Sequence, residues 1–189
     1  KEGLRSIRIK NMKNGSDDYI DFNEETYSAY ISTNEEYNTN ILRYSYSSML
    51  TPSSVYDYNM DTGEKVLLKQ REIPGKGYNQ DLYEAKTIYA TSRDGERVPI
   101  YLVYRKDMKK NSPQPLLLYS YGSYGSTSDP YFSSTRLSLL DRGVIYALTN
   151  VRGSQIYGRR SYDDGKMDNK MRFHHSLTGN SYLALFPIW

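Results

Sequence analysis

The stretch PLLLYSYGSYGSTSDP, residues 115–130, decides the fold of this chain. It opens with an apolar run from Leu116 to Tyr119, which is typical of a buried strand covered on both faces. Alternating tyrosine, glycine and serine follow at once, and glycine and serine favour a turn while glycine also lets the backbone approach another group closely. The loop is therefore either an ordinary surface turn or the rim of an active site.

A helix and a second strand are expected after this loop. Asp129 can cap the helix, Pro130 fits its first turn, and Gly143 can end it. Apolar residues recur between them at near-helical spacing, and the run VIYALTN, residues 144–150, then indicates a second buried strand. A strand, a helix and a strand joined by short loops predict a βαβ unit with parallel strands.

Parallel strands bring two glycine-containing loops to one edge of the predicted sheet. The loop YSYGSYG follows the first strand, and NVRGSQIYG, residues 150–158, follows the second. Both strands end at the same edge, and this is the edge where ligands bind in open α/β sheets. The topology therefore favours the active-site rim, with tyrosine hydroxyls presented over a closely approached ligand.

The part of the chain before this unit is expected to be rich in β-strands. The segment SVYDYNMDTGEKVLLKQ predicts a hairpin that turns through residues 61–63, and KTIYATSRDGERVPIYLVYRK predicts another that turns through residues 93–95. Alternate apolar residues at positions 98–104 share one face of the returning strand, which we expect to be buried. The stretch REIPGKGYNQ, residues 71–80, indicates a linker.

The composition argues against several classes of partner. The formal net charge is +3, and basic and acidic residues are interspersed, so binding to nucleic acid is not expected. No apolar run approaches the roughly 18 residues of a membrane span, so no membrane association is expected. The absence of cysteine and of a visible signal sequence favours the cytoplasm. The oligomeric state is left open.

No complete catalytic or metal-binding motif is present in the sequence. Ser123 lacks the first glycine of a G-x-S-x-G elbow. The adjacent histidines at 174–175 have no ligand spacing, and YGSYGS is not a phosphate loop, so neither a metal nor a cofactor is expected. We interpret the pair Asp163–Asp164 as a turn or a cap rather than an acid and a base. Arg152 suits either an ion pair or a ligand contact, and the ion pair is favoured.

Seven segments between Gly3 and Lys166 carry a family resemblance by their order. They are RSIRIKNM, DFNEETYSAYIST, LRYSYSSMLTPSSVYDYNMDTGEKVLLKQ, ATSRDGERVPIYLVYRK, PLLLYSYGSYG, LSLLDRGVIYALTNVRGS and YGRRSYDDGK. In this series the chain resembles the oligopeptidase B branch of the prolyl oligopeptidases, serine peptidases of family S9, subfamily A. The resemblance implies a mixed β and α/β fold class, in which the terminal part of a β-propeller precedes the opening βαβ part of an α/β-hydrolase domain.

The resemblance also implies domain boundaries and a function. Residues 1–77 would form the propeller portion, residues 78–170 the peptidase portion, and residues 171–189 a divergent tail. The tail RFHHSLTGNSYLALFPIW loses the resemblance abruptly, and we expect a change of reading frame near Met171. The implied activity is hydrolysis of short peptides after arginine or lysine, with short peptides as the partners. The alternative is a non-catalytic, β-rich interaction or scaffold module.

The resemblance assigns roles to residues of the two loops. Tyr121 would give its hydroxyl to the oxyanion hole, where a preorganised donor stabilises the developing charge. Tyr124 would line the pocket beside the scissile bond. The supporting loop residues would be Gly122, Asn150, Arg152 and Gly153. The family's nucleophilic serine and its aspartate and histidine partners lie downstream of this unit, so we expect this chain alone to be an inactive fragment.

Overall fold

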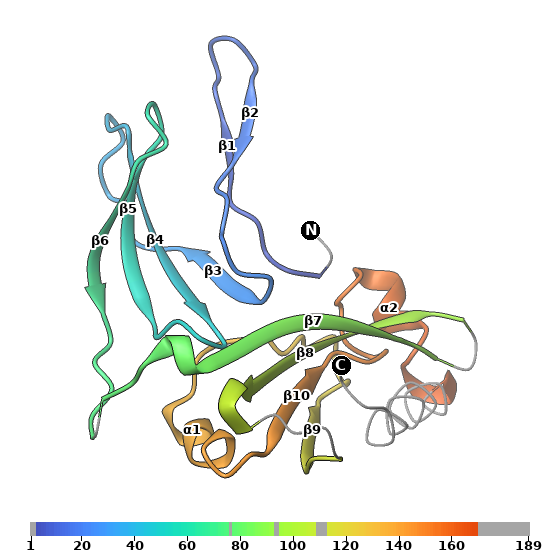
Figure 1. Cartoon of the computed structure of the whole chain (residues 1–189). Helices are drawn as coiled ribbons and strands as arrows, with labels where there is room; N and C mark the ends of the chain where they lie inside the picture. Colours follow the sequence, from blue (N-terminus) through green and yellow to red (C-terminus); the bar gives the residue numbers. More distant parts are fainter. Residues whose placement is uncertain (1–2, 76, 93–94, 109–112, 170–189) are drawn as a thin grey trace.

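The computed structural model describes residues 3–75, 77–92, 95–108 and 113–169. Within these residues the chain forms a small hairpin and two four-stranded sheets (Figure 1). The hairpin pairs β1 (Arg8–Lys10) with β2 (Asp17–Tyr19). Short helices complete the fold, namely η1 (Gln80–Leu82), η2 (Lys106–Met108), α1 (Ser134–Leu140), α2 (Arg159–Asp163) and η3 (Met167–Asn169). No helix in the described residues has the length and apolar character needed to span a bilayer.

The first four-stranded sheet, which we call the meander sheet, is antiparallel throughout. Its strands lie in chain order, as β3 (Tyr27–Ile31), β4 (Ile41–Ser48), β5 (Ser54–Asn59) and β6 (Lys65–Gln70). Its core is largely aromatic, because Tyr44, Tyr46 and Tyr58 pack with aliphatic residues from the segment around the first hairpin. Phe22 stacks on Tyr46 with ring centroids 5.2 Å apart, which is a favourable aromatic arrangement.

The hairpin predicted at residues 61–63 is present in the meander sheet. β5 and β6 are its two strands, and the Gly63 amide donates to the Asn59 carbonyl at 2.8 Å. Gly63 has a φ of 76°, a left-handed conformation that glycine adopts without steric cost. The turn chemistry of the sequence was thus sufficient to place this hairpin.

The second sheet, which we call the mixed sheet, has the strand order β7-β8-β10-β9. Its strands are β7 (Tyr83–Thr91), β8 (Arg97–Arg105), β9 (Leu116–Ser120) and β10 (Ile145–Thr149). β10 is antiparallel to β8 and parallel to β9, and α1 connects β9 to β10. The predicted βαβ unit is therefore confirmed. β7 and β8 confirm the strands of the second predicted hairpin, although positions 93–94 of its turn lie outside the described residues.

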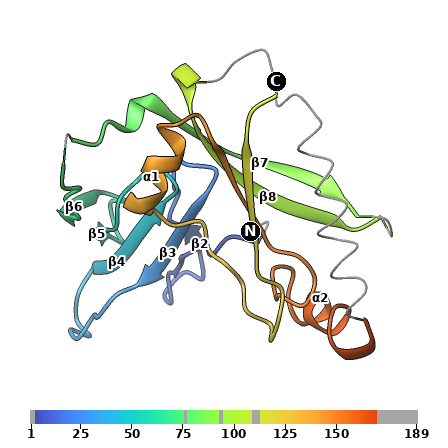
Figure 2. The same ribbon diagram turned by 90° about the horizontal axis from the view of Figure 1, so that it is seen from below.

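β8 forms the centre of the mixed sheet's core. The face predicted to be buried, which carries Ile100, Leu102 and Tyr104, is buried against Ile145 and Ala147. The opposite face is buried as well, because apolar side chains of α1 and of the segment after β4 pack on it. Figure 2 shows α1 lying against the mixed sheet on the side toward the meander sheet.

The expectation that residues 116–119 are covered on both faces is wrong. Leu116 and Leu118 pack into the core of the mixed sheet, but Leu117 is 45% exposed and Tyr119 is 50% exposed. β9 is the edge strand and pairs with β10 alone among the described strands. Among the described residues, the apolar run therefore has one buried face and one largely exposed face.

The expected start of the helix is also wrong. α1 begins at Ser134, with Ser133 at its N-cap position, so neither Asp129 nor Pro130 belongs to it. The Asp129 carboxylate instead accepts hydrogen bonds from Tyr30 and Ser28 of the meander sheet. The Asp129 carboxylate therefore binds side chains of a distant strand, whereas the local sequence pattern predicted that it would cap the helix.

The linker predicted at residues 71–80 connects the two sheets, and its described residues, which exclude position 76, contain no strand. Tyr78 at its end stacks on Tyr83, meets Phe132 edge-on, and donates its hydroxyl to the Leu50 carbonyl at 2.6 Å. This one side chain contacts β7 of the mixed sheet and the turn that follows β4 of the meander sheet. The domain boundary at residue 77 stays a prediction.

Replacing Leu102 by alanine should destabilise the chain by about 2–5 kcal/mol, because it removes a fully buried side chain and leaves a cavity. Leu68→Ala is the matched control, since Leu68 lies in an exposed strand and its loss should change the stability by less than about 0.5 kcal/mol. Thermal unfolding followed by circular dichroism measures both. Equal shifts of the two midpoints would contradict the burial pattern.

Candidate functional site

Two loops meet at the carboxyl edge of the mixed sheet. We call residues 121–126, which follow β9, the tyrosine loop, and residues 150–158, which follow β10, the arginine loop. The Gly125 amide donates to the Gly153 carbonyl at 2.9 Å, and Gly125 forms an isolated parallel bridge with Ser154. The close approach of the two loops that the topology predicted is therefore present.

Two glycines allow this approach. A Cβ atom at Gly153 would lie 2.0 Å from the Gly122 carbonyl oxygen, and one at Gly165 would lie 2.3 Å from the Gly153 amide nitrogen. Both distances are far below van der Waals contact, so no larger residue fits without movement of the backbone. Gly153 also has a φ of 91°, which disfavours any residue with a Cβ. The tyrosine loop is thus held by backbone packing.

Asn150 fastens the segment after the tyrosine loop to the end of β10. Its side-chain oxygen accepts from the Ser128 amide at 2.7 Å, and its side-chain nitrogen donates to the Ser128 carbonyl at 2.8 Å. The side chain is almost fully buried, so these two bonds satisfy polar groups that would otherwise be costly to bury. Asn150 therefore supports the loop and does not face solvent.

Arg152 forms an ion pair, as the sequence favoured. Its guanidinium lies 3.7 Å from the Glu96 carboxylate, and Arg160 approaches the same carboxylate at 3.9 Å. The Arg152 side chain is only 9% exposed, so it is held inside the arginine loop. The interaction present is thus the ion pair, and not the ligand contact that the sequence left as the alternative.

Tyr121 and Tyr124 are both exposed to solvent. Tyr121 is 41% exposed and Tyr124 is 89% exposed, and neither hydroxyl has a hydrogen-bond partner among the described residues. Tyr124 has a φ of 57°, a left-handed conformation that costs a bulky residue on the order of 1–3 kcal/mol. Such strain is concentrated at functional sites, because the surrounding structure must stabilise it.

Asp163 and Asp164 lie at the end of α2 and act as a helix end and as ion-pair partners, as the sequence indicated, rather than as an acid and a base. Asp164 caps the helix, and both carboxylates pair with neighbouring basic residues of the same segment. A hydrogen bond from Lys166 is the main cause that lowers the pKa of Asp163. The described residues contain no group of three or more acidic, histidine or cysteine side chains that could hold a metal ion, and the histidines at 174–175 lie outside them.

One buried polar residue near the site was not singled out from the sequence. Arg136 lies on α1 and its side chain is buried, whereas the sequence predicted no more than a helical position for it. A charged residue within an apolar stripe was the signal that could have drawn attention to it.

Comparison with protein families and curated proteins identifies relatives of this chain. Residues 1–71 match the family described as prolyl oligopeptidase, N-terminal beta-propeller domain. Dipeptidyl aminopeptidase BI of Pseudoxanthomonas mexicana is 48% identical over 169 residues, which cover 89% of this chain and 23% of that protein. Protease 2 of Moraxella lacunata is 38% identical over 168 residues, which cover 89% and 24%. The chain thus spans about a quarter of the length of these relatives.

Solved structures agree with this placement. Oligopeptidase B from Leishmania major superposes on 97% of this chain with a TM-score of 0.85 and 29% identity, and this match covers 27% of that protein. Oligopeptidase B from Trypanosoma brucei, solved in its closed form with covalently bound antipain, superposes on 98% with a TM-score of 0.87 and 32% identity, again covering 27%. The expected fold class, part of a β-propeller followed by part of an α/β domain, is confirmed.

Gly153→Ala should separate the two loops, because the new Cβ would collide with the Gly122 carbonyl. We expect a loss of stability of about 2 kcal/mol or more, and faster hydrogen exchange of the Gly125 amide, whose acceptor is on Gly153. Hydrogen-exchange mass spectrometry of the tyrosine loop is the measurement.

Gly158→Ala is the matched control for this substitution. Gly158 has a similar φ of 86°, but nothing lies within 4 Å of the position that a Cβ would take, so it carries the conformational cost without the collision. If both variants exchange alike at Gly125, the close backbone contact does not hold the tyrosine loop.

Proposed function

This chain belongs to the prolyl oligopeptidase family of S9 peptidases, and we propose that it contributes the oxyanion-stabilising side of the active site in a longer serine oligopeptidase. In this proposal the meander sheet is the last part of the propeller, and the mixed sheet opens the peptidase domain. The substrates are short peptides, cleaved after arginine or lysine. The nucleophilic serine and its aspartate and histidine partners would come from sequence beyond this chain.

The position of Tyr121 is the observation that carries the proposal. Tyr121 lies directly after β9, at the edge where ligands bind in parallel α/β sheets, and its hydroxyl has no partner among the described residues. The close backbone contact between Gly122 and Gly153 fixes the backbone of the tyrosine loop. A phenol held in this way can donate a hydrogen bond to an oxyanion without reorganisation at the moment of reaction, which is how such donors accelerate acyl transfer.

Tyr124 takes a different role in the same proposal. Its side chain is 89% exposed, and its backbone has the left-handed conformation described above. An exposed aromatic ring at this place can pack against the substrate residue beside the scissile bond. Gly122, Asn150, Arg152 and Gly153 hold the two loops and do not touch the substrate.

Other expectations remain part of the proposal. We propose that neither nucleic acid nor a membrane is a partner, and that the protein acts in the cytoplasm. No cofactor takes part, because acyl transfer by a serine nucleophile needs only a base and an oxyanion hole.

Tyr121→Phe in the full-length protein should lower kcat by about 10²–10³ while KM changes little, because the hydroxyl acts mainly in the transition state. Steady-state hydrolysis of an arginyl-coumarin peptide measures both constants. Tyr37→Phe, which removes the same atom from an exposed tyrosine remote from the two loops, should leave both unchanged. A loss confined to KM would remove Tyr121 from the oxyanion role.

The specificity is tested with a panel of coumarin peptides in the full-length protein. We expect faster hydrolysis after arginine and lysine than after proline, and no turnover by the 189-residue chain alone. The relatives bear the names of a dipeptidyl aminopeptidase and of prolyl endopeptidases, so the panel includes both kinds of substrate. A preference for the prolyl substrate would replace the basic specificity, and labelling of a residue of this chain by a covalent serine inhibitor would contradict the assignment of the nucleophile.

The encoding DNA provides an independent test. Read in three frames downstream of the codon for Met171, it should yield a G-x-S-x-G elbow followed by aspartate and histidine. If no frame contains that series, the scaffold interpretation replaces the peptidase, and the tyrosine loop becomes a binding surface.

A further inference from the structure

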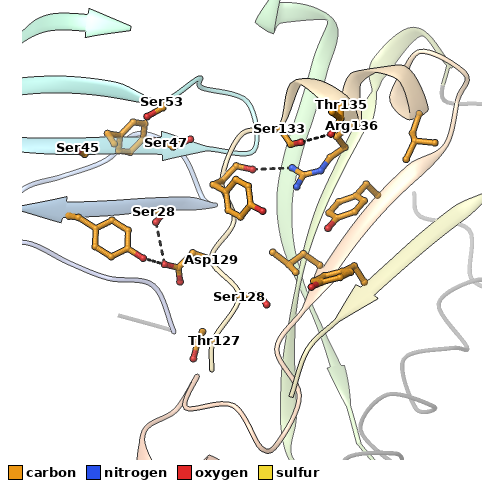
Figure 3. A pocket seen from close by; sticks show the side chains of 17 residues that line it. Ser28, Ser45, Ser47, Ser53, Thr127, Ser128, Asp129, Ser133, Thr135 and Arg136 are labelled. Atoms are coloured by element: carbon orange, nitrogen blue, oxygen red, sulfur yellow. Dashed lines mark hydrogen bonds between the residues drawn. The ribbon is translucent and has the colours of Figure 1, made fainter. Parts of the chain in front are cut away.

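A cavity of approximately 750 Å³ lies between the meander sheet and the mixed sheet. This volume is within the range of small-molecule sites, which is about 300–1,000 Å³. Hydroxyl groups line both of its walls (Figure 3), among them Ser28, Ser45, Ser47, Thr127, Ser128 and Thr135. Tyr119, which precedes the tyrosine loop, also lines it, so the cavity lies beside the candidate site.

Arg136 is the cation of this cavity. It extends from α1, is only 8% exposed, and donates to the Tyr131 carbonyl at 3.0 Å (Figure 3). Its guanidinium lies over the ring of Tyr146, 4.1 Å from the centroid. No carboxylate among the described residues lies within ion-pair distance of it. Burial is the main cause that lowers its pKa.

The cavity also contains one carboxylate, but that group is already engaged. Asp129 accepts from Tyr30 and Ser28 and lies 3.7 Å from the Arg5 guanidinium. It therefore fastens the segment after the tyrosine loop to the meander sheet and does not neutralise Arg136. Asp129 thus has an ion-pair partner, whereas Arg136 has none among the described residues.

The Arg136 guanidinium is bonded to the Tyr131 carbonyl and to the Tyr146 side chain, and these two partners leave further N–H donors for a ligand. Arginine carries five N–H donors in a planar fork, and a carboxylate accepts two of them at once. A buried charge without an anion is costly, and a bidentate carboxylate offsets much of that cost. The hydroxyls around Arg136 can exchange hydrogen bonds with main-chain amides, which both donate and accept.

We propose that this cavity binds the C-terminal carboxylate of a short peptide, with Arg136 as its anchor and the hydroxyl-lined walls contacting the peptide main chain. The choice of a peptide rests on the proposed function, since the cavity adjoins the loop that would act on peptides. The carboxylate itself follows from Arg136 and its surroundings.

The test measures peptide binding to the full-length protein by isothermal titration calorimetry. The probes are N-acetyl-trialanine, which has a carboxylate and no ammonium group, and its C-terminal amide. The acid should bind about 10- to 100-fold more tightly than the amide, which corresponds to a hydrogen bond between charged groups. Arg136→Gln should abolish that preference, and Arg136→Lys should retain part of it, because lysine keeps the charge but loses the fork.

Arg142→Gln is the matched control, because it removes the same charge from an exposed position just after the same helix. It should leave the preference for the acid intact. Equal affinity of the unmodified protein for acid and amide, including no detectable binding of either, would overturn the proposal. So would inorganic phosphate that binds as tightly as the acid, since the site would then hold any small anion.

Turnover of the arginyl-coumarin substrate separates this proposal from the peptidase assignment. If the acid binds through Arg136 but no substrate in the panel is cleaved, the peptidase function fails and the carboxylate site stands. If substrates are cleaved but acid and amide bind alike in every variant, the carboxylate site fails and the peptidase function stands.

Discussion

The hydrogen bonds that join β9 to β10 in parallel hold every part of the candidate site in place. The register runs from Ile145 opposite Leu116 to Thr149 opposite Ser120, so both strands end together at one edge. The tyrosine and arginine loops begin there and have no room to diverge, which explains why Gly153 must pass against Gly122 without a side chain between them. An antiparallel pairing of the same strands would have sent the two loops to opposite ends of the sheet.

The segment that follows the tyrosine loop carries a second constraint, because it is fastened to both sheets. Asn150 binds the backbone of Ser128 from the mixed sheet, while the Asp129 carboxylate accepts from the meander sheet one residue later. The Phe132 amide then donates to the Ser47 hydroxyl at 3.1 Å. A shift of one sheet against the other would therefore pull directly on the chain that leaves the candidate site, and it would also change the width of the cavity beside Arg136.

The sequence predicted those features that depend on local pattern and topology. Alternation and turn residues located both hairpins and the buried face of β8, and strand–helix–strand order predicted the meeting of the two loops. The sequence-based predictions failed where residues distant in the sequence determine the contacts or the burial of a side chain. Asp129 looked like a helix cap because only its neighbours in sequence were visible, and the exposure of Leu117 depends on the edge position of β9. The isolation of Arg136 from any carboxylate of the described residues could not be derived from its neighbours in sequence either.

The order of strands in the mixed sheet has a consequence for how the chain acquires its structure. β10 lies between β8 and β9, although both are synthesised before it. The meander sheet and the β7–β8 hairpin can form from neighbouring segments as soon as these appear, because local pairings need little loop closure. β9, in contrast, pairs only with β10 among the described strands, so this pairing must wait until β10 has been made and inserted. The surface that we assign to chemistry is thus completed late, once β10 has joined the two halves of the sheet.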